Sequence, residues 1–278
     1  MLDFSTRNEL SLHAEVIGDL NAAMAQLGIE AIAVGAFARD LHFHYRAGVE
    51  IQRGTEDVDI ALSVSSWEEF GRLLQVLIES KTFSKTTGRD HRLTHRRDRY
   101  LDLIPFGGVE NSDRQIAWPP EGDTVMQVFG FKEALASAEQ VLLPTGVQIQ
   151  VASVPALALL KLTAWEERNL LAPRKDAADL MLIIEHYLDI GTNRARLLGD
   201  FSEWTEEEGF DVVEGGARLL GMEIRALLTA EDHRRAARIL EQQTDSATDA
   251  RLAREMYSLD PDRSIRLLRN LLRGLNED

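Results

Sequence analysis

Two aspartates, Asp57 and Asp59, lie two residues apart in a run that is otherwise rich in β-branched and aliphatic residues. Side chains of a strand alternate between its two faces, so both carboxylates are expected on one face. Val58, Ile60 and Leu62 are then expected on the other face, in a core. Like charges this close destabilise a fold unless a cation lies between them. The pair therefore predicts either a metal site or solvated aspartates on a half-exposed edge strand.

A third carboxylate, Asp102, lies in the strand-like run 100–106. Three carboxylates on strands can hold two divalent cations, which neutralise a triphosphate and stabilise the attacking and leaving oxygens of an in-line displacement. Upstream, Gly35 separates a short β-type run from a helix start, where backbone N–H groups bind phosphate. Taken singly, Gly35 is compatible with a plain turn and Asp102 with a solvated strand residue. Their order along the chain favours the nucleotide-binding interpretation.

This order resembles the DNA polymerase β-type nucleotidyltransferase superfamily, in which a glycine turn, an Asp-x-Asp strand and a lone strand Asp follow one another. The resemblance is carried by Gly35-Ala36, Asp57-Val58-Asp59 and Leu101-Asp102-Leu103. It implies Mg²⁺ or Mn²⁺ held by the three aspartates, with Asp102 also able to deprotonate the acceptor hydroxyl. Ala36 stands where the superfamily usually has Gly or Ser, so a hydroxyl contact to phosphate is lost and backbone N–H groups alone remain.

A later motif narrows the resemblance. Lys161 lies on a helix that is otherwise apolar, and Lys175-Asp176-Ala177-Ala178-Asp179-Leu180 follows it. Together with the phrases VGAFARDL, which contains Arg39, and DLIPFGG, which begins at Asp102, this resembles abortive-infection nucleotidyltransferase toxins of the AbiEii/AbiGii type. The resemblance covers roughly residues 30 to 190.

The toxin resemblance implies a function and its partners. The enzyme would move a nucleoside monophosphate from an NTP to an acceptor, with tRNA or another RNA as the expected acceptor, and would be the toxin of a bacterial type IV toxin–antitoxin system with a cognate antitoxin. Lys161 would be a catalytic contact to the triphosphate. The nucleotide would also meet Gly35, Ala36, Arg39, Asp176 and Asp179.

The position of Lys161 on an apolar helix also has an electrostatic cost, whatever the family. An unpaired buried ammonium is costly, so Lys161 must reach solvent, pair with a carboxylate or meet a ligand anion. Asp176 and Asp179 are three residues apart and share a helix face, so either could orient the lysine or contact the nucleotide. Helix N-terminal charge that stabilises the macrodipole is the alternative reading of these two aspartates.

Composition bounds the remaining possibilities. The chain has 278 residues, no cysteine and a formal net charge of −15, which exclude disulfides, thiolate catalysis and a broadly basic RNA-coating surface. The longest apolar run, near 156–160, is too short to span a bilayer, and the first residues do not read as a signal peptide. A cytoplasmic location without membrane contact is expected. The pairs His42/His44 and His91/His95 lack the further ligands of a zinc motif.

One stretch, residues 85–99, is locally basic. It is the best candidate for contacting an RNA acceptor, and a solvated hairpin of mixed charge is an equal alternative. Its cationic side chains are Lys85, Arg89, His91, Arg92, His95, Arg96, Arg97 and Arg99.

Hydrophobic periodicity predicts the helices and strands that carry these candidate residues. The pattern predicts an α/β (α+β) catalytic domain over 1–152, a mixed sheet flanked by helices, and an α-helical domain over 153–278 that contributes Lys161 and Asp176. Helices are expected over 10–27, 67–78, 131–138, 156–168 and 174–187, and strands over 30–34, 57–62, 100–106, 140–143 and 147–151.

Three functions remain open from the sequence. The first is the toxin that modifies RNA. The second is a nucleotidyltransferase of small molecules such as antibiotics, which the net acidity favours because cationic aminoglycosides would be attracted. The third is a non-catalytic nucleotide-binding module, against which the complete set of three carboxylates argues.

Overall fold

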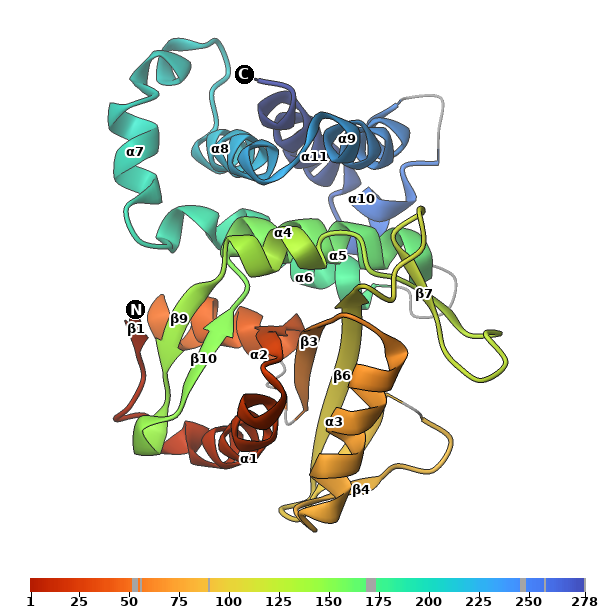
Figure 1. Ribbon diagram of the computed structural model, residues 1–278. Helices are drawn as coiled ribbons and strands as arrows, with labels where there is room; N and C mark the ends of the chain where they lie inside the picture. Colours follow the sequence, from red (N-terminus) through yellow and green to blue (C-terminus); the bar gives the residue numbers. More distant parts are fainter. Residues whose placement is uncertain are drawn as a thin grey trace. The chain divides into compact units, whose positions relative to one another are not determined.

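The structure is a computed structural model that describes residues 1–51, 55, 57–89, 91–168, 174–245, 249–257 and 259–277 (Figure 1). The chain forms two compact units. The first comprises Met1–Leu41 and Ile51–Ser153, and the second comprises His42–Glu50 and Val154–Asp278. A segment from the N-terminal half of the chain thus belongs to the second unit, which no hydrophobic pattern indicated.

The first unit is built on an eight-stranded mixed sheet in the order β1-β9-β10-β2-β3-β6-β5-β4. The pairs β1–β9, β10–β2 and β3–β6 are parallel, and the other neighbours are antiparallel. The strands are β1 (Leu2–Asp3), β2 (Glu30–Val34), β3 (Val58–Val64), β4 (Phe83–Lys85), β5 (Arg92–His95), β6 (Arg99–Gly107), β9 (Glu139–Leu142) and β10 (Gln148–Val151).

Strand β3 lies inside this sheet, between β2 and β6. The alternative of an edge strand with solvated aspartates is therefore wrong. Val58, Ile60 and Leu62 are all fully buried, as the alternation predicted.

The helices of the first unit are α1 (Ser11–Leu27), α2 (Gly35–Asp40), α3 (Trp67–Glu79) and α4 (Phe131–Ala136), with a separate two-stranded sheet of β7 (Gln115–Ala117) and β8 (Val125–Gln127). Gly28 ends α1 in the left-handed region at φ 69°. Ser66 caps α3 by accepting from the N–H of Glu69 at 3.3 Å. The Glu69 carboxylate accepts in return from the N–H of Ser65 at 2.6 Å, one residue before the position of a regular capping box.

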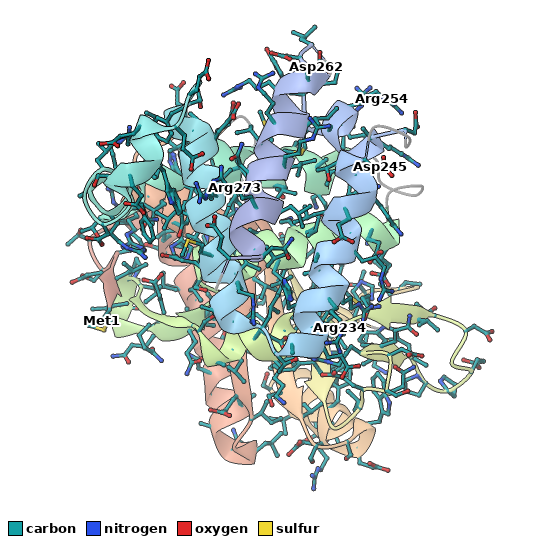
Figure 2. All side chains as sticks on the ribbon, turned by 90° about the horizontal axis from the view of Figure 1, so that it is seen from above. Met1, Arg234, Asp245, Arg254, Asp262 and Arg273 are labelled. Carbon is teal, nitrogen blue, oxygen red and sulfur yellow. The ribbon has the colours of Figure 1, made fainter. Side chains whose placement is uncertain are left out.

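The second unit is helical, and its helices are α5 (Val154–Arg168), α6 (Lys175–His186), α7 (Asn193–Gly199), α8 (Val212–Leu227), α9 (Ala230–Thr244), α10 (Arg251–Met256) and α11 (Pro261–Leu275). Helix α11 has an acidic first turn and a basic last turn, which suits its macrodipole. Figure 2 labels Asp262 and Arg273 near its two ends. Within the described part of the chain, no helix is both long and apolar enough to cross a membrane.

Helices α8 and α11 cross at two glycines. A Cβ on Gly221 would overlap the carbonyl oxygen of Leu271, and a Cβ on Gly274 would overlap the carbonyl oxygen of Arg218. These atoms belong to backbone, which cannot turn aside as a flexible side chain can. The close crossing buries Leu267, Leu268 and Leu271 of α11 almost completely.

We therefore expect Gly221→Ala or Gly274→Ala to lower the free energy of unfolding by about 2 kcal/mol or more, because the added methyl pushes the two helices apart. Chemical denaturation followed by circular dichroism measures this change. Gly71→Ala is the matched control: Gly71 lies inside α3, and a Cβ there meets nothing within 4 Å. It should be neutral or stabilise by up to ~1 kcal/mol. Equal effects of the three variants would contradict the close crossing.

Candidate active site

The sheet brings the three predicted aspartates together in the first unit. Asp59 on β3 and Asp102 on β6 are register partners in a parallel pair, so their side chains share one face of the sheet. Asp57 directly precedes β3. Asp102 is buried, and the side chain of Asp57 is 37% exposed. Three carboxylates thus converge from two neighbouring strands.

Gly35 supports this cluster through its missing side chain. Val34 is the register partner of Asp59 across the antiparallel β2–β3 pair, so the chain turns into α2 beside the Asp59 side chain. Gly35 has φ +65°, and a Cβ there would overlap Oδ2 of Asp59 and come within 2.8 Å of its Cγ. Both the backbone conformation and the space require glycine here.

Among the described residues, Arg92 pairs with the carboxylates of this cluster. It is the register partner of Asp102 across the antiparallel β5–β6 pair. Its Nε donates to Oδ1 of Asp102 at 2.7 Å and its Nη2 to Oδ2 at 2.6 Å, a bidentate pairing. The same Nη2 donates to Oδ2 of Asp57 at 3.3 Å. One guanidinium therefore bridges two of the three aspartates.

The electrostatics of Arg92 reflect all three carboxylates. Its hydrogen bond to Asp102 is the largest cause that raises the guanidinium pKa, and the charges of Asp102, Asp57 and Asp59 raise it further against the opposing effect of burial. The guanidinium also lies 4.7 Å from the centroid of the Tyr100 ring. Arg92 is thus held permanently charged between an acidic cluster and an aromatic face.

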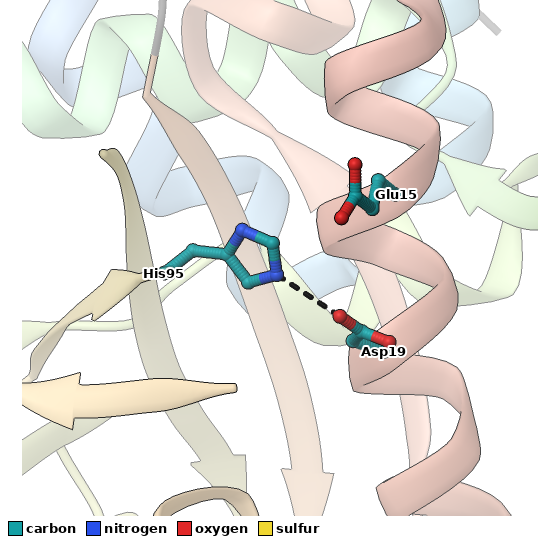
Figure 3. Close-up of side chains that lie close together, drawn as sticks. All are labelled: Glu15, Asp19 and His95. Carbon is teal, nitrogen blue, oxygen red and sulfur yellow. Dashed lines mark hydrogen bonds and ion pairs between the residues drawn. The ribbon is translucent and has the colours of Figure 1, made fainter. Parts of the chain in front are cut away.

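His95, Arg96 and Arg97 of the basic stretch also pair with carboxylates. Figure 3 shows His95 of β5 directed at Glu15 and Asp19 of α1. Its Nε2 lies 3.0 Å from Asp19, and its Nδ1 accepts from the N–H of Arg97, which places the ring proton on Nε2. Arg96 pairs with Glu15 and Asp19 at 3.1 Å. These pairs are those expected of a mixed-charge hairpin, and the contact of this stretch with RNA stays a prediction. Asp90 of the stretch lies outside the described residues.

Glu15, Asp19 and His95 present ligand atoms within 4.8 Å of one another, a spacing that could suit a metal. Both ring nitrogens of His95 already have partners, and arginines neutralise the two carboxylates. We therefore interpret this cluster as a polar contact that joins α1 to β5.

Lys161 lies in the second unit, in the middle of α5, and is 6% exposed. Its Nζ lies 3.3 Å from Oδ1 of Asp176 and 2.5 Å from Oδ2 of Asp179, both on α6. Of the three outcomes that burial allows, the structure has carboxylate pairing. One lysine and two aspartates leave the triad with a formal charge of −1.

The remaining predicted nucleotide contacts lie on α2. Gly35 and Ala36 are its first two residues. Arg39 is buried and donates to Oδ1 of its neighbour Asp40 through Nε at 2.8 Å and through Nη2 at 2.6 Å. This arginine is thus held by the protein itself.

The role of Arg92 differs from the RNA contact that the sequence predicted for residues 85–99. A signal was available. The turn through Arg97 joins two strand-like runs, and counting back equally on either side of it places Arg92 opposite Asp102. The contact between Gly35 and Asp59 had no comparable signal, because it depends on the register of β2 against β3.

The acidic cluster suits a hard divalent cation. Its donors are carboxylate oxygens on rigid strands, which Mg²⁺ and Mn²⁺ prefer, and a glycine leaves the Asp59 carboxylate room. With Arg92 the cluster keeps a net charge of −2 from three aspartates and one arginine, so it can still attract a divalent ion.

Comparisons with known proteins give a family and weak structural neighbours. No curated protein matches the chain. One of these neighbours is a solution structure of the antibiotic-resistance factor ANT(2'')-Ia, whose sequence is 16% identical to this chain. The match covers 69% of this chain and 92% of that one, with a TM-score of 0.39. A crystal structure of ANT(2'')-Ia with adenylyl-2''-tobramycin is 15% identical, covering 69% and 98% with a TM-score of 0.39.

An antigenic nucleotidyltransferase-like protein from Paracoccidioides brasiliensis is 15% identical, covering 76% of this chain and 94% of that one with a TM-score of 0.42. The family comparison reaches further. The model of the nucleotidyl transferase AbiEii toxins of type IV toxin–antitoxin systems matches residues 25–268, which cover most of both units of the fold. The chain therefore belongs to the AbiEii nucleotidyltransferase toxin family.

Proposed function

We propose that this chain transfers a nucleoside monophosphate from an NTP to an RNA acceptor, with release of pyrophosphate, and that Asp57, Asp59 and Asp102 form its divalent-metal site. The observation that carries this proposal is the convergence of the three carboxylates on one sheet face, with Gly35 against Asp59. A family of nucleotidyltransferase toxins supports the reaction class.

Each residue of the cluster has a task in this reaction. Bound there, Mg²⁺ or Mn²⁺ would neutralise the triphosphate and the charge that develops on the attacking and leaving oxygens. Asp59, to which Gly35 leaves space, is the anchor of the site, and Asp57 is its more exposed ligand. Asp102 completes the set and is positioned as the base for the acceptor hydroxyl, provided that Arg92 releases one of its oxygens.

The nucleotide contacts follow the family resemblance. Gly35 and Ala36 offer backbone N–H groups to the phosphates. We assign to Lys161 the neutralisation of the triphosphate, with Asp176 and Asp179 holding its ammonium in place. The guanidinium of Arg39 is paired with the carboxylate of Asp40 on the same helix, so Arg39 is not a free cation for the phosphates.

The acceptor and the antitoxin complete the proposal. An RNA acceptor, with tRNA as the first to test, fits a toxin that must act on a cellular target, and a cognate antitoxin would restrain it. A small cationic acceptor is the competing possibility, because the chain carries a net charge of −15.

The direct test incubates the protein with labelled NTPs, Mg²⁺ and total RNA. We expect label to enter RNA and expect Asp59→Asn to reduce this by at least about 100-fold, since a metal ligand is lost. Asp123→Asn removes an exposed carboxylate of the same unit and should act as wild type. Label on an aminoglycoside but not on RNA would show that the acceptor is a small molecule and not RNA. Tight NTP binding without any incorporation would refute catalysis.

Gly35→Ala tests the positioning of the anchor. The added methyl would displace the Asp59 carboxylate, so we expect transfer to slow on the order of 100-fold. Gly28→Ala is the matched control, because Gly28 has a similar φ of +69° but a Cβ there meets nothing within 4 Å. It should cost stability without slowing transfer. A similar loss of rate in both variants would mean that backbone strain, and not Asp59, explains the effect.

The Lys161 triad calls for paired variants. Lys161→Met leaves two buried aspartates without their cation, so unfolding free energy should fall by about 3 kcal/mol. Adding Asp176→Asn and Asp179→Asn removes that repulsion and should restore much of the stability. If Lys161 contacts the triphosphate, the triple variant still shows a raised KM for NTP. A triple variant with wild-type KM and kcat would reduce the lysine to a structural role.

A further inference from the structure

Arg92 occupies the carboxylate oxygens that the proposed metal site would use. Its Nε and Nη2 take both oxygens of Asp102, and Nη2 also reaches Asp57. The Arg92 side chain is 17% exposed and that of Asp102 is 12% exposed, so water screens the pair weakly. The guanidinium and a divalent ion would be two cations competing for the same oxygens.

We propose that Arg92 is a built-in competitor of the divalent metal, which keeps the free protein from holding metal tightly and couples metal uptake to the arrival of the nucleotide. This inference rests on the proposed metal site and adds a residue that controls its loading. Arg92 is a positioning residue here, because it acts through Asp57 and Asp102.

Charge balance gives the competition its direction. Without Arg92 the three aspartates carry a charge of −3, and with it the cluster carries −2. The attraction for a divalent ion is therefore weaker while the guanidinium is present, and a metal seated on Asp57 and Asp102 would lie against a fixed positive charge. Uptake of metal is favoured only when Arg92 withdraws from at least one aspartate.

A nucleotide supplies the reason for Arg92 to withdraw. Its triphosphate is anionic, and a planar guanidinium pairs with phosphate as well as with carboxylate. Tyr100 offers the Arg92 side chain a surface while it moves from carboxylate to phosphate. The guanidinium already lies 4.7 Å from the centroid of the Tyr100 ring, and Tyr100 is 41% exposed. An NTP–metal complex would thus offer a phosphate to the guanidinium of Arg92 and a metal ion to the aspartates that Arg92 leaves.

Arg114 provides an internal comparison. Its side chain is 21% exposed, close to that of Arg92, and it also pairs with two carboxylates, Glu110 at 2.6 Å and Glu133 at 3.4 Å. Glu110 follows β6 and Glu133 lies on α4, outside the proposed metal site. A variant at Arg114 therefore removes a similar charge from the same unit without freeing a proposed metal ligand.

The test measures Mn²⁺ binding to the full chain without nucleotide, by electron paramagnetic resonance. We expect Arg92→Gln to bind Mn²⁺ about three- to tenfold more tightly than wild type, Arg92→Lys to lie between them because it keeps the charge but loses the bidentate pairing, and Arg114→Gln to match wild type. With a non-hydrolysable NTP present, the gap between Arg92→Gln and wild type should narrow.

A second measurement separates competition from plain structural support. Arg92→Gln should melt at a lower temperature than wild type in EDTA, because three carboxylates are left to repel, and Mn²⁺ should restore its Tm by more than it raises that of wild type. A structural role alone would lower the Tm without a larger response to metal.

The outcomes distinguish this inference from the proposed function. Equal or weaker Mn²⁺ binding by Arg92→Gln, with wild-type binding still dependent on Asp59, overturns the competition and leaves the metal site standing. If Asp59→Asn has no effect on Mn²⁺ binding by wild type or by Arg92→Gln, the proposed metal site itself fails. Tighter binding that Asp59→Asn abolishes supports both.

Discussion

Repulsion among three carboxylates is the constraint on which the first unit depends. Asp57, Asp59 and Asp102 converge because β3 and β6 are parallel and in register, and a fold that gathers like charges must give them space or a counter-charge. Two devices do so here. Gly35 gives the Asp59 side chain space, and Arg92 supplies a counter-charge to the other two. The central position of β3 makes the cluster rigid, since it is hydrogen-bonded on both sides.

Much of this arrangement could be predicted from sequence because it follows from alternation. The shared face of Asp57 and Asp59 and the burial of Val58 are properties of a single strand, and the chain encodes them locally. The pairing of Asp102 with Arg92 depends on a short hairpin and was within reach. The approach of Gly35 to Asp59 depends on which strand pairs with which and in what register, and no local pattern encodes that.

The second unit also holds aspartates around a single cation, here two aspartates around Lys161. A buried lysine was identified as costly from its apolar helix, and burial indeed required partners. That both Asp176 and Asp179 would be those partners was one of the open alternatives, since helix periodicity placed them on one face but could not say what that face met. In each unit, ionised groups come as an uneven cluster of aspartates around one cation.

The passage of residues 42–50 into the second unit has a consequence for how the protein can be made. His42 and Phe43 are fully buried, yet they precede most of the first unit's sheet in the chain. A fragment that begins at Val154 would lack this segment and leave its place in the helical unit unfilled. The helical unit therefore cannot be produced whole as a continuous fragment, and on the ribosome its earliest piece must wait for more than a hundred residues before its packing partners emerge.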